Sequence, residues 1–391
     1  MLAFSKIVVA GGGVVGNSIA YFLAKEHGVA CTIVDPVGMC VSRFQSSFQD
    51  RFRDNSPTHA FRRAPAASGK AGGFLARDWS DGSPIQELQR RSFDLHAEIA
   101  EHLGLSTIDY RRLECVAVAV DGSSSKKPGG KKLEGLEWAD IGAVGSRPMG
   151  GPDTIAQVHP KKLCEAMFRF SQEAAGSKLV VGKVVGADID DGEVAGVRLE
   201  DGTKLDADAL IVACGPWTDA ARNWFGKEIS LPTFGGIKYH SILVRSPRVL
   251  SQAVFFQGHG DPEVYPRPDG DAYITGFPDG PLFAMKETPG EEEVRAEKID
   301  QLVDATKKTS SELGGIKPHT VQSCYLPTTT DGLPVIGPIS GVKGGFVASG
   351  HGCWGILNSP ATGEAMAELL VKGKASHLDL RMLGLDSPYR R

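Results

Sequence analysis

Short apolar runs and one helical pattern alternate along the first part of the chain. Residues 7–10 (IVVA) predict a buried strand, which leads directly into GGGVVG at 11–16. Apolar positions at helical spacing continue to Gly28, where the helix is expected to end. Residues 31–34 predict a second strand that ends at Asp35. Strand, glycine turn, helix, strand and acid in this order are typical of a unit that binds an adenine dinucleotide.

Each part of this unit has a physical reason to contact a dinucleotide. Gly11 permits a tight turn, Gly13 lets a pyrophosphate approach the backbone, and Gly16 lets the helix lie close to the strand. The helix N-terminus offers free N–H groups to the phosphates, and Asp35 is spaced to bind ribose hydroxyls. The alternative is an ordinary βαβ turn without a ligand. The expected cofactor contacts here are Gly11, Gly13, Val14, Val15, Gly16 and Asp35.

Farther along, the pattern predicts an α/β chain with a second, antiparallel layer. Helices are expected from Ser83-Pro84 to Gly104 and from His159-Pro160 onward, because Pro favours the first helical position. Single strands are expected at 113–120, 179–185, 209–213 and 345–348. Between about 226 and 315 we expect an antiparallel sheet for substrate, with strands at 237–245, 253–257 and 271–277 and a charged helix at about 290–313.

The segment from Gly38 to Ala67 shows no sustained apolar period. It is rich in Ser, Phe and Arg, with turn-forming residues at 55–57. We therefore expect residues 36–66 to be an insertion without stable structure. A basic arm for an acidic partner and an error in the gene model are the alternatives. A second polar segment, SSSKKPGGKK at 123–132, is expected to be a solvated loop.

Composition excludes several classes of protein. A net charge of −4 gives no electrostatic reason to expect nucleic acid, and no apolar run approaches the ~18–20 residues of a membrane span. The seven cysteines include no C-x-x-C, so neither a disulfide framework nor a zinc site is expected. Because the first strand starts within the first ten residues, no leader peptide is expected ahead of it. The cytoplasm is the expected location, and an organellar form with a longer N-terminus stays open.

The C-terminal part is again dense in glycine. TDGLPVIG occupies 330–337 and GHGCWGI occupies 350–356, after the strand at 345–348. A helix is expected at about 360–372, with Ser359-Pro360 as its start and Gly363 allowing a close approach. Its N-terminus would favour a developing negative charge.

Four motifs together resemble the FAD-dependent oxidoreductases of the D-amino-acid oxidase, glycine oxidase and sarcosine oxidase family. They are GGGVVG with Asp35, SGKAGG at 68–73, ALIVACGPWT at 209–218, and DGLPVIG with GHGCWGILNSPATG at 331–363. The resemblance is closest to a eukaryotic branch and covers nearly the whole chain except 36–66. It implies an α/β, Rossmann-type FAD-binding domain made of 1–80, 150–225 and 316–391. An antiparallel-sheet α+β substrate domain would comprise 81–149 and 226–315.

The resemblance also implies a set of FAD contacts beyond the first unit. Ser68, Lys70, Gly72 and Gly73 would run beside the flavin, and Val184 or Val185 would meet adenine through the backbone. The other implied contacts are Cys214, Gly215 and Trp217 on the dinucleotide and Gly350, His351, Gly352, Gly355 and Ile356 at the isoalloxazine edge.

Three positions show how far the resemblance extends toward the sarcosine oxidases. Cys324 has the spacing of a flavin-linked cysteine, with a buried free thiol as the alternative. Lys286 has a spacing similar to that of an oxygen-activating lysine, with a solvated loop lysine as the alternative. Trp354 stands where those enzymes carry a lysine for the substrate carboxylate, which puts a simple amino-acid site in doubt.

Other polar residues remain candidates for the substrate end. Arg267 and Arg77 could bind an anion, and Tyr265 or Tyr239 could line the pocket, although each could be structural. His351 lies among glycines at the implied flavin edge, where positioning is favoured over metal binding. The catalytic candidates are therefore Lys286, His351 and Arg267.

These residues predict an FAD-dependent oxidoreductase that oxidises the C–N bond of a small amine or amino acid. As the resemblance implies, a hydride passes to flavin N5, the imine hydrolyses, and oxygen or another acceptor takes the electrons. An FAD-containing assembly or trafficking factor without turnover is the alternative, motivated by Trp354. An NAD-dependent dehydrogenase would leave the C-terminal glycine motif unexplained.

Overall fold

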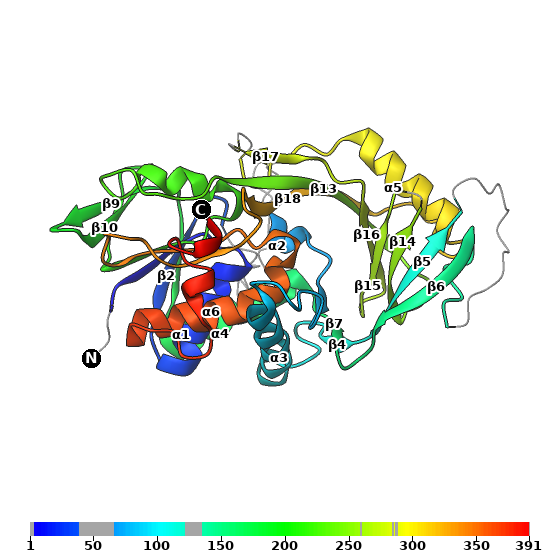
Figure 1. Ribbon diagram of the computed structural model, residues 1–391, viewed down its shortest axis with the longest axis horizontal. Helices are drawn as coiled ribbons and strands as arrows, with labels where there is room; N and C mark the ends of the chain where they lie inside the picture. The colour runs from blue at the N-terminus through cyan, green and yellow to red at the C-terminus, as the bar shows by residue number, and fades with distance from the viewer. Residues whose placement is uncertain are drawn as a thin grey trace, which may run out of the picture.

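The chain folds into two lobes, one built around a mainly parallel sheet and one around a large, mostly antiparallel sheet (Figure 1). This computed structural model describes residues 4–38, 66–121, 135–258, 260–283, 285 and 288–390. Of the insertion expected at 36–66, residues 39–65 lie outside the described residues, as does the loop expected at 123–132. No described helix combines the length and the hydropathy needed to cross a membrane.

The first sheet joins strands from three distant parts of the chain, in the order β19-β20-β12-β1-β2-β8. All neighbouring pairs are parallel except β19 with β20. The strands are β1 (Ile7–Ala10), β2 (Cys31–Asp35), β8 (Lys178–Val181), β12 (Ala209–Val212), β19 (Val335–Pro338) and β20 (Gly345–Ser349). The carboxyl ends of the five parallel strands therefore meet at one edge, where such sheets bind ligands.

Both faces of this sheet are covered, which explains why its strands read as continuous apolar runs. Val9 and Ile211 pack against helices on one face, whereas Val8 and Leu210 pack against a small sheet and a 3-10 helix on the other. The helices are α1 (Val14–His27), α3 (Gln86–Leu103), α4 (Pro160–Ala175) and α6 (Gly355–Lys372). The opposite cover consists of β9 (Val184–Asp190), β10 (Glu193–Leu199), β11 (Lys204–Asp206) and η2 (Gly215–Asn223).

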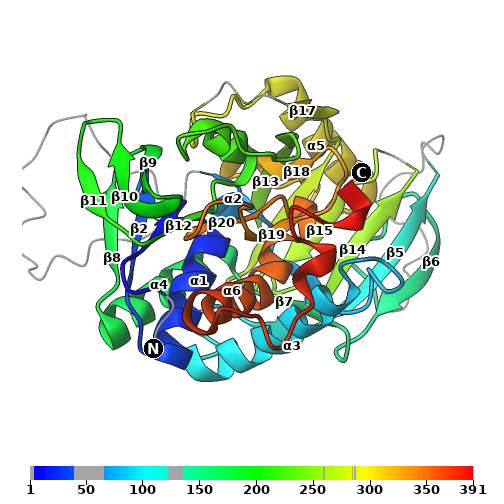
Figure 2. The same ribbon diagram turned by 60° about the vertical axis from the view of Figure 1, so that its left-hand side comes forward.

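Helices α1 and α6 lie side by side, and Figure 2 shows α3 beside α6. A Cβ on Gly363 would lie 2.6 Å from the Cβ of Ser18, so only glycine permits this separation between α1 and α6. The close approach predicted for Gly363 is confirmed. It brings the N-termini of both helices to the same edge of the first sheet.

The start predicted for the last helix at Ser359-Pro360 is wrong, because α6 begins at Gly355 and contains Pro360. Proline cannot donate to the carbonyl of Ile356. That oxygen instead bonds His96 Nε2 of α3 at 3.0 Å and accepts from Ser359 Oγ at 3.0 Å. Contacts with α3 therefore let the helix run through a proline that the sequence alone marks as its start.

The second sheet has eight strands and forms the other lobe. Their order is β17-β13-β16-β15-β14-β5-β6, and β18 pairs with β13. The strands are β5 (Glu114–Val120), β6 (Ala143–Gly150), β13 (Phe234–Arg245), β14 (Gln252–Gln257), β15 (Glu263–Pro266), β16 (Asp271–Gly276), β17 (Pro281–Phe283) and β18 (Thr320–Thr329). All of its pairs are antiparallel except β14 with β5. Helix α5 (Ala296–Thr309) covers one face.

Three other predicted elements have different bounds in the structure. The strand expected at 179–185 is two strands, β8 and β9, which are separated at Gly182. The Gly182 N–H donates to Asp35 O and so extends the contact between β8 and β2 by one residue. The turn at Ser83 precedes α3, which begins at Gln86. The charged helix expected at 290–313 is shorter, since α5 spans only Ala296–Thr309. Glu292 precedes it and is buried beside α2 (Ala67–Lys70), where it binds Lys70. A small sheet of β3 (Phe74–Ala76), β4 (Arg111–Arg112) and β7 (Ile155–Gln157) was not predicted.

Candidate functional site

A cavity of about 540 Å³ lies where β1, β2, β12 and β20 end. Like the strands of the first sheet, the residues that line it come from segments far apart in the sequence. Most of the cofactor contacts predicted from the sequence line it, namely Gly11, Gly13, Val14, Val15, Asp35, Ser68, Val184, Val185, Cys214, Gly215, Trp217, Gly350, His351, Gly352, Gly355 and Ile356. This is the edge at which parallel sheets bind ligands.

The glycine turn after β1 leaves no room for side chains at two of its positions. Gly11 has φ +115°, and a Cβ there would lie 2.2 Å from Ala213 O at the end of β12. Gly16 does not line the cavity, because its Cα faces the turn, where a Cβ would lie 2.1 Å from Gly11 O. Both glycines let the turn, the helix and the neighbouring strand approach closely.

Asp35 ends β2 at the cavity. Its carboxylate accepts hydrogen bonds from the N–H groups of Gly12 at 2.9 Å and Val37 at 3.0 Å. Burial raises the pKa of this carboxyl, and the backbone donors offset part of that effect. The turn thus fixes a carboxylate at the cavity wall, where it can accept bonds from ligand hydroxyls.

The segment SGKAGG lines the cavity only in part, and several of its residues contact other elements instead. Ser68 Oγ accepts from Val14 N at 2.9 Å and joins α2 to the start of α1. Lys70 does not line the cavity. Its ammonium lies 2.6 Å from Glu292 Oε2 and donates to Ser323 O at 2.8 Å, which ties α2 to β18.

Gly72 and Gly73 also lie outside the cavity lining. A Cβ on Gly72 would lie 2.2 Å from Tyr265 Cδ2, and one on Gly73 would lie 1.9 Å from Val158 O. These two glycines therefore let the chain pass against β15 and the start of α4.

The other end of the cavity is formed by the turn between β20 and α6. Gly350 has φ +83°, and His351 is 5% exposed with its Nε2 2.9 Å from Thr362 Oγ1. Burial lowers the pKa of His351 to about 4, so the ring is neutral at pH 7. Gly355 and Ile356 bring the N-terminus of α6 to the cavity, where its partial positive charge favours an anionic group. No group of three metal-ligating side chains is found among the described residues.

The remaining candidates lie outside the cavity lining. Arg267 is 5% exposed, donates to Ala71 O at 2.9 Å and lies over the Tyr273 ring. Cys324 is buried opposite Tyr239 on β13, and burial raises its pKa to about 12. Lys286 lies outside the described residues.

Sequence reasoning missed several residues that line the cavity. They include Lys183, Asn223, Trp224, Pro289, Leu326, Pro327 and Cys353. Leu326 and Pro327 follow Cys324 on β18, and only the pairing of β18 with β13 places them at the cavity. Cys353 was within a recognised motif but carried no signal of its own.

The cavity fits FAD in the order of its chemistry. The charged lining residues Asp35 and Lys183 lie together where β2 ends, because Gly182 N bonds Asp35 O. The glycine turn and the start of α1 follow, as a pyrophosphate requires. Leu326, Pro327 and the 350–356 turn supply apolar and backbone surfaces for a flat ring at the other end. The fold and the cavity thus define a dinucleotide-binding oxidoreductase of the flavin type.

Comparison with known proteins gives the family. Residues 59–369 match the model of the FAD dependent oxidoreductase family DAO, and the chain belongs to this family. A Schizosaccharomyces pombe protein named only as an oxidoreductase is 29% identical over 408 residues, which cover 97% of both chains. The glycine oxidase of Geobacillus kaustophilus is 26% identical over 97% of this chain and 96% of its own.

Solved structures show the same fold over nearly the whole chain. The structure of that glycine oxidase superposes with a TM-score of 0.73, covering 98% of this chain and 99% of its own at 23% identity. The L-proline dehydrogenase of P. horikoshii also reaches 0.73, covering 99% of this chain and 97% of its own at 20% identity. The protein is therefore an FAD-dependent oxidoreductase with a small-molecule substrate and an electron acceptor.

Proposed function

We propose that this enzyme oxidises the C–N bond of an amine or amino acid. The substrate carbon loses a hydride and its nitrogen loses a proton, which leaves an imine that water hydrolyses to a carbonyl compound. FAD, when bound, supplies the hydride acceptor and passes the electrons to oxygen or another acceptor. The observation that carries this proposal is the cavity end at 350–356, beside the aromatic face of the second sheet.

The cavity residues have different roles in this proposal. Gly11, Gly13 and Asp35 hold the ADP half of FAD, and the turn from Gly350 to Ile356 holds the isoalloxazine edge. His351 keeps that turn in place through Thr362 as a neutral ring, and this is a positioning role. Support comes from relatives named as glycine oxidase and L-proline dehydrogenase, whose named substrates are amines.

The division into domains follows from the same proposal. Residues 1–80, 150–225 and 316–391 form the FAD-binding domain, and 81–149 with 226–315 form the substrate domain. The parallel sheet supports the first assignment and the eight-stranded sheet the second. Helix α3 belongs to the substrate domain by sequence position but packs in the core of the parallel sheet. Strand β18 belongs to the FAD-binding part by sequence position, and it pairs with β13 of the other lobe along ten residues.

Anaerobic reduction of the bound flavin tests the proposed reaction. A panel of N-methyl amino acids, D-amino acids and simple amines is mixed with the yellow protein, and flavin absorbance is followed. Bleaching by one class of amine is the expected result, and oxygen uptake then separates an oxidase from a dehydrogenase. If no amine bleaches the flavin, the proposal fails, and an FAD-containing factor without turnover becomes the better account.

A further inference from the structure

Glu263 on β15 is a partly buried carboxylate with no basic partner among the described residues. The Tyr265 hydroxyl donates to its Oε2. Burial raises the pKa of this carboxyl. A buried carboxylate whose partner is a neutral hydroxyl and not a cation still costs stability, so its position calls for a functional explanation.

The strand register places Glu263 on the face of the second sheet that α5 does not cover. Glu263 lies opposite Phe255 on β14 and Thr275 on β16. The intervening residue Val264 belongs to the core beneath α5. Since side chains alternate across a strand, Glu263 and Tyr265 both point toward the side on which Trp354 and Phe74 pack.

This face adjoins the apolar end of the cavity. Tyr265 packs in one cluster with Trp354, and a Cβ on Gly72 would lie 2.2 Å from Tyr265 Cδ2, while the neighbouring residue Ala71 lines the cavity. In agreement with this placement, the charge of Glu263 adds to the effect of burial in raising the pKa of Cys353. Cys353 itself lines the cavity. Glu263 therefore lies close to the end at which the proposed reaction occurs.

Neither basic residue expected to bind an anion contacts Glu263. Arg77 donates to both oxygens of Asp94, at 3.0 and 3.1 Å. Arg267 lies on the same face of the sheet as Glu263 but four residues farther along the chain, roughly 13 Å for an extended strand. It donates to Ala71 O, and its guanidinium lies over the Tyr273 ring. Among the described lining residues of the cavity, Lys183 carries the basic charge, and it lies at the Asp35 end. A substrate carboxylate would meet Glu263 without a nearby cation.

Aromatic rings beside Glu263 complete the chemistry of this face. Trp79 and Phe255 have ring centroids 5.2 Å apart, and Trp79 and Trp354 are 6.0 Å apart. All three side chains are partly exposed. Such rings attract ammonium groups through their faces and also bind apolar substituents.

We propose that Glu263 binds the ammonium group of the substrate and accepts one of its protons, which leaves the neutral amine for oxidation, so that the enzyme takes amines with an apolar substituent and without a carboxylate on the oxidised carbon. This inference rests on the proposed oxidation of amines and names the class of amine. Trp354 then serves as an aromatic wall of the substrate site.

Binding of three matched probes to the FAD-loaded protein tests this inference. Benzylamine, benzyl alcohol and benzoate share a ring and differ in charge, and tryptophan fluorescence and the thermal shift report their binding. Benzylamine is expected to bind at least about tenfold more tightly than benzoate. The variant Glu263→Gln is expected to lose about tenfold in affinity for benzylamine and to bind benzyl alcohol unchanged, because a charge-assisted hydrogen bond contributes about that factor.

Two further variants keep the test decisive. Glu263→Asp retains the charge and is expected to retain the preference for benzylamine, whereas the exposed Glu114→Gln on the same sheet leaves all three affinities unchanged. Tighter binding of benzoate, or equal losses for benzylamine and benzyl alcohol in Glu263→Gln, would overturn the inference. Flavin bleaching by amino acids alone would also overturn it and leave the proposed reaction standing. Benzylamine binding through Glu263 without bleaching by any amine would contradict the reaction instead.

Discussion

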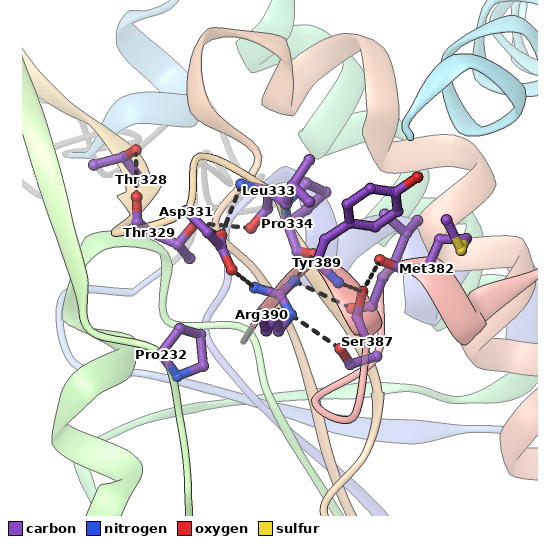
Figure 3. A network of polar contacts seen from close by, with 12 residues as sticks. Pro232, Thr328, Thr329, Asp331, Leu333, Pro334, Met382, Ser387, Tyr389 and Arg390 are labelled. Atoms are coloured by element: carbon purple, nitrogen blue, oxygen red, sulfur yellow. Dashed lines mark hydrogen bonds and ion pairs between the residues drawn. The ribbon is translucent and has the colours of Figure 1, made fainter. Parts of the chain in front are cut away.

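Arg390, close to the end of the chain, forms an ion pair with Asp331, with Nη1 2.5 Å from Oδ2 (Figure 3). The other oxygen of Asp331 accepts from Thr329 Oγ1 at 2.8 Å and from Leu333 N at 2.9 Å. A Cβ on Gly350 would lie 2.9 Å from Thr329 Cγ2. The end of the chain therefore supports the turn that backs the cavity at Gly350.

Removal of this ion pair is expected to weaken both the fold and FAD retention. The Arg390 side chain is 6% exposed and also donates to Gly384 O and Pro334 O, so Arg390→Ala removes the ion pair and these hydrogen bonds together. We expect a loss of about 1–3 kcal/mol in the free energy of unfolding and faster release of FAD. Urea titration and the fluorescence of released flavin measure the two effects. Arg381→Ala is the control, since Arg381 pairs with Asp379 at the surface, and an equal loss in this variant would contradict the prediction.

Widening the contact between α1 and α6 is expected to disturb the cavity. Gly363→Ala places a Cβ 2.6 Å from the Ser18 backbone carbon, so the helices must separate. Overpacking of this kind costs about 1–3 kcal/mol, and it moves the two helix N-termini that meet the cofactor. Thermal unfolding and FAD content are the measurements. Gly315→Ala meets no atom within 4 Å and serves as control; full FAD content in Gly363→Ala would refute the link between helix spacing and the cofactor.

Acid is expected to destabilise the protein through His351. Its folded pKa is about 4, lowered by burial, whereas an unfolded histidine titrates near 6.5. The unfolded state therefore binds the proton first, and stability is lost as the pH falls from about 6.5 to 4. The contribution is about 3 kcal/mol when complete. Urea unfolding at pH 7 and 4.5 is compared for the wild type and His351→Asn, and parallel losses in the two proteins would contradict the prediction.

The charge on Asp35 is expected to matter for cofactor affinity. Asp35→Asn keeps an oxygen that can accept from Gly12 N but loses the carboxylate that binds ligand hydroxyls. Hydrogen bonds to charged groups contribute about 1.5–3 kcal/mol, so the Kd for FAD is expected to rise at least tenfold. Titration of the apoprotein with FAD measures it. The surface variant Asp206→Asn should bind FAD with the wild-type Kd. An unchanged Kd in Asp35→Asn would show that Asp35 does not bind FAD.

The sequence by itself determined the local units and the family. Apolar runs, the glycine turn and Asp35 are signals within about thirty residues, and residues 59–369, which include the C-terminal motifs, match one family. Such signals reflect backbone geometry, because a turn with positive φ or a close helix contact requires glycine wherever it occurs. The glycines, Asp35 and the 350–356 turn do line one cavity, with the exceptions of Gly16, Gly72 and Gly73.

Only the tertiary structure decided which polar groups are engaged and which are available. Lys70 is bound to Glu292, 222 residues away, and Arg390 is bound to Asp331. His96 lets α6 run through Pro360, and the register of β15 leaves Glu263 without a cation among the described residues. These outcomes depend on contacts between distant segments, and burial changes the free energy of a charge far more than its neighbours in sequence do. The sequence pattern carries no record of such contacts.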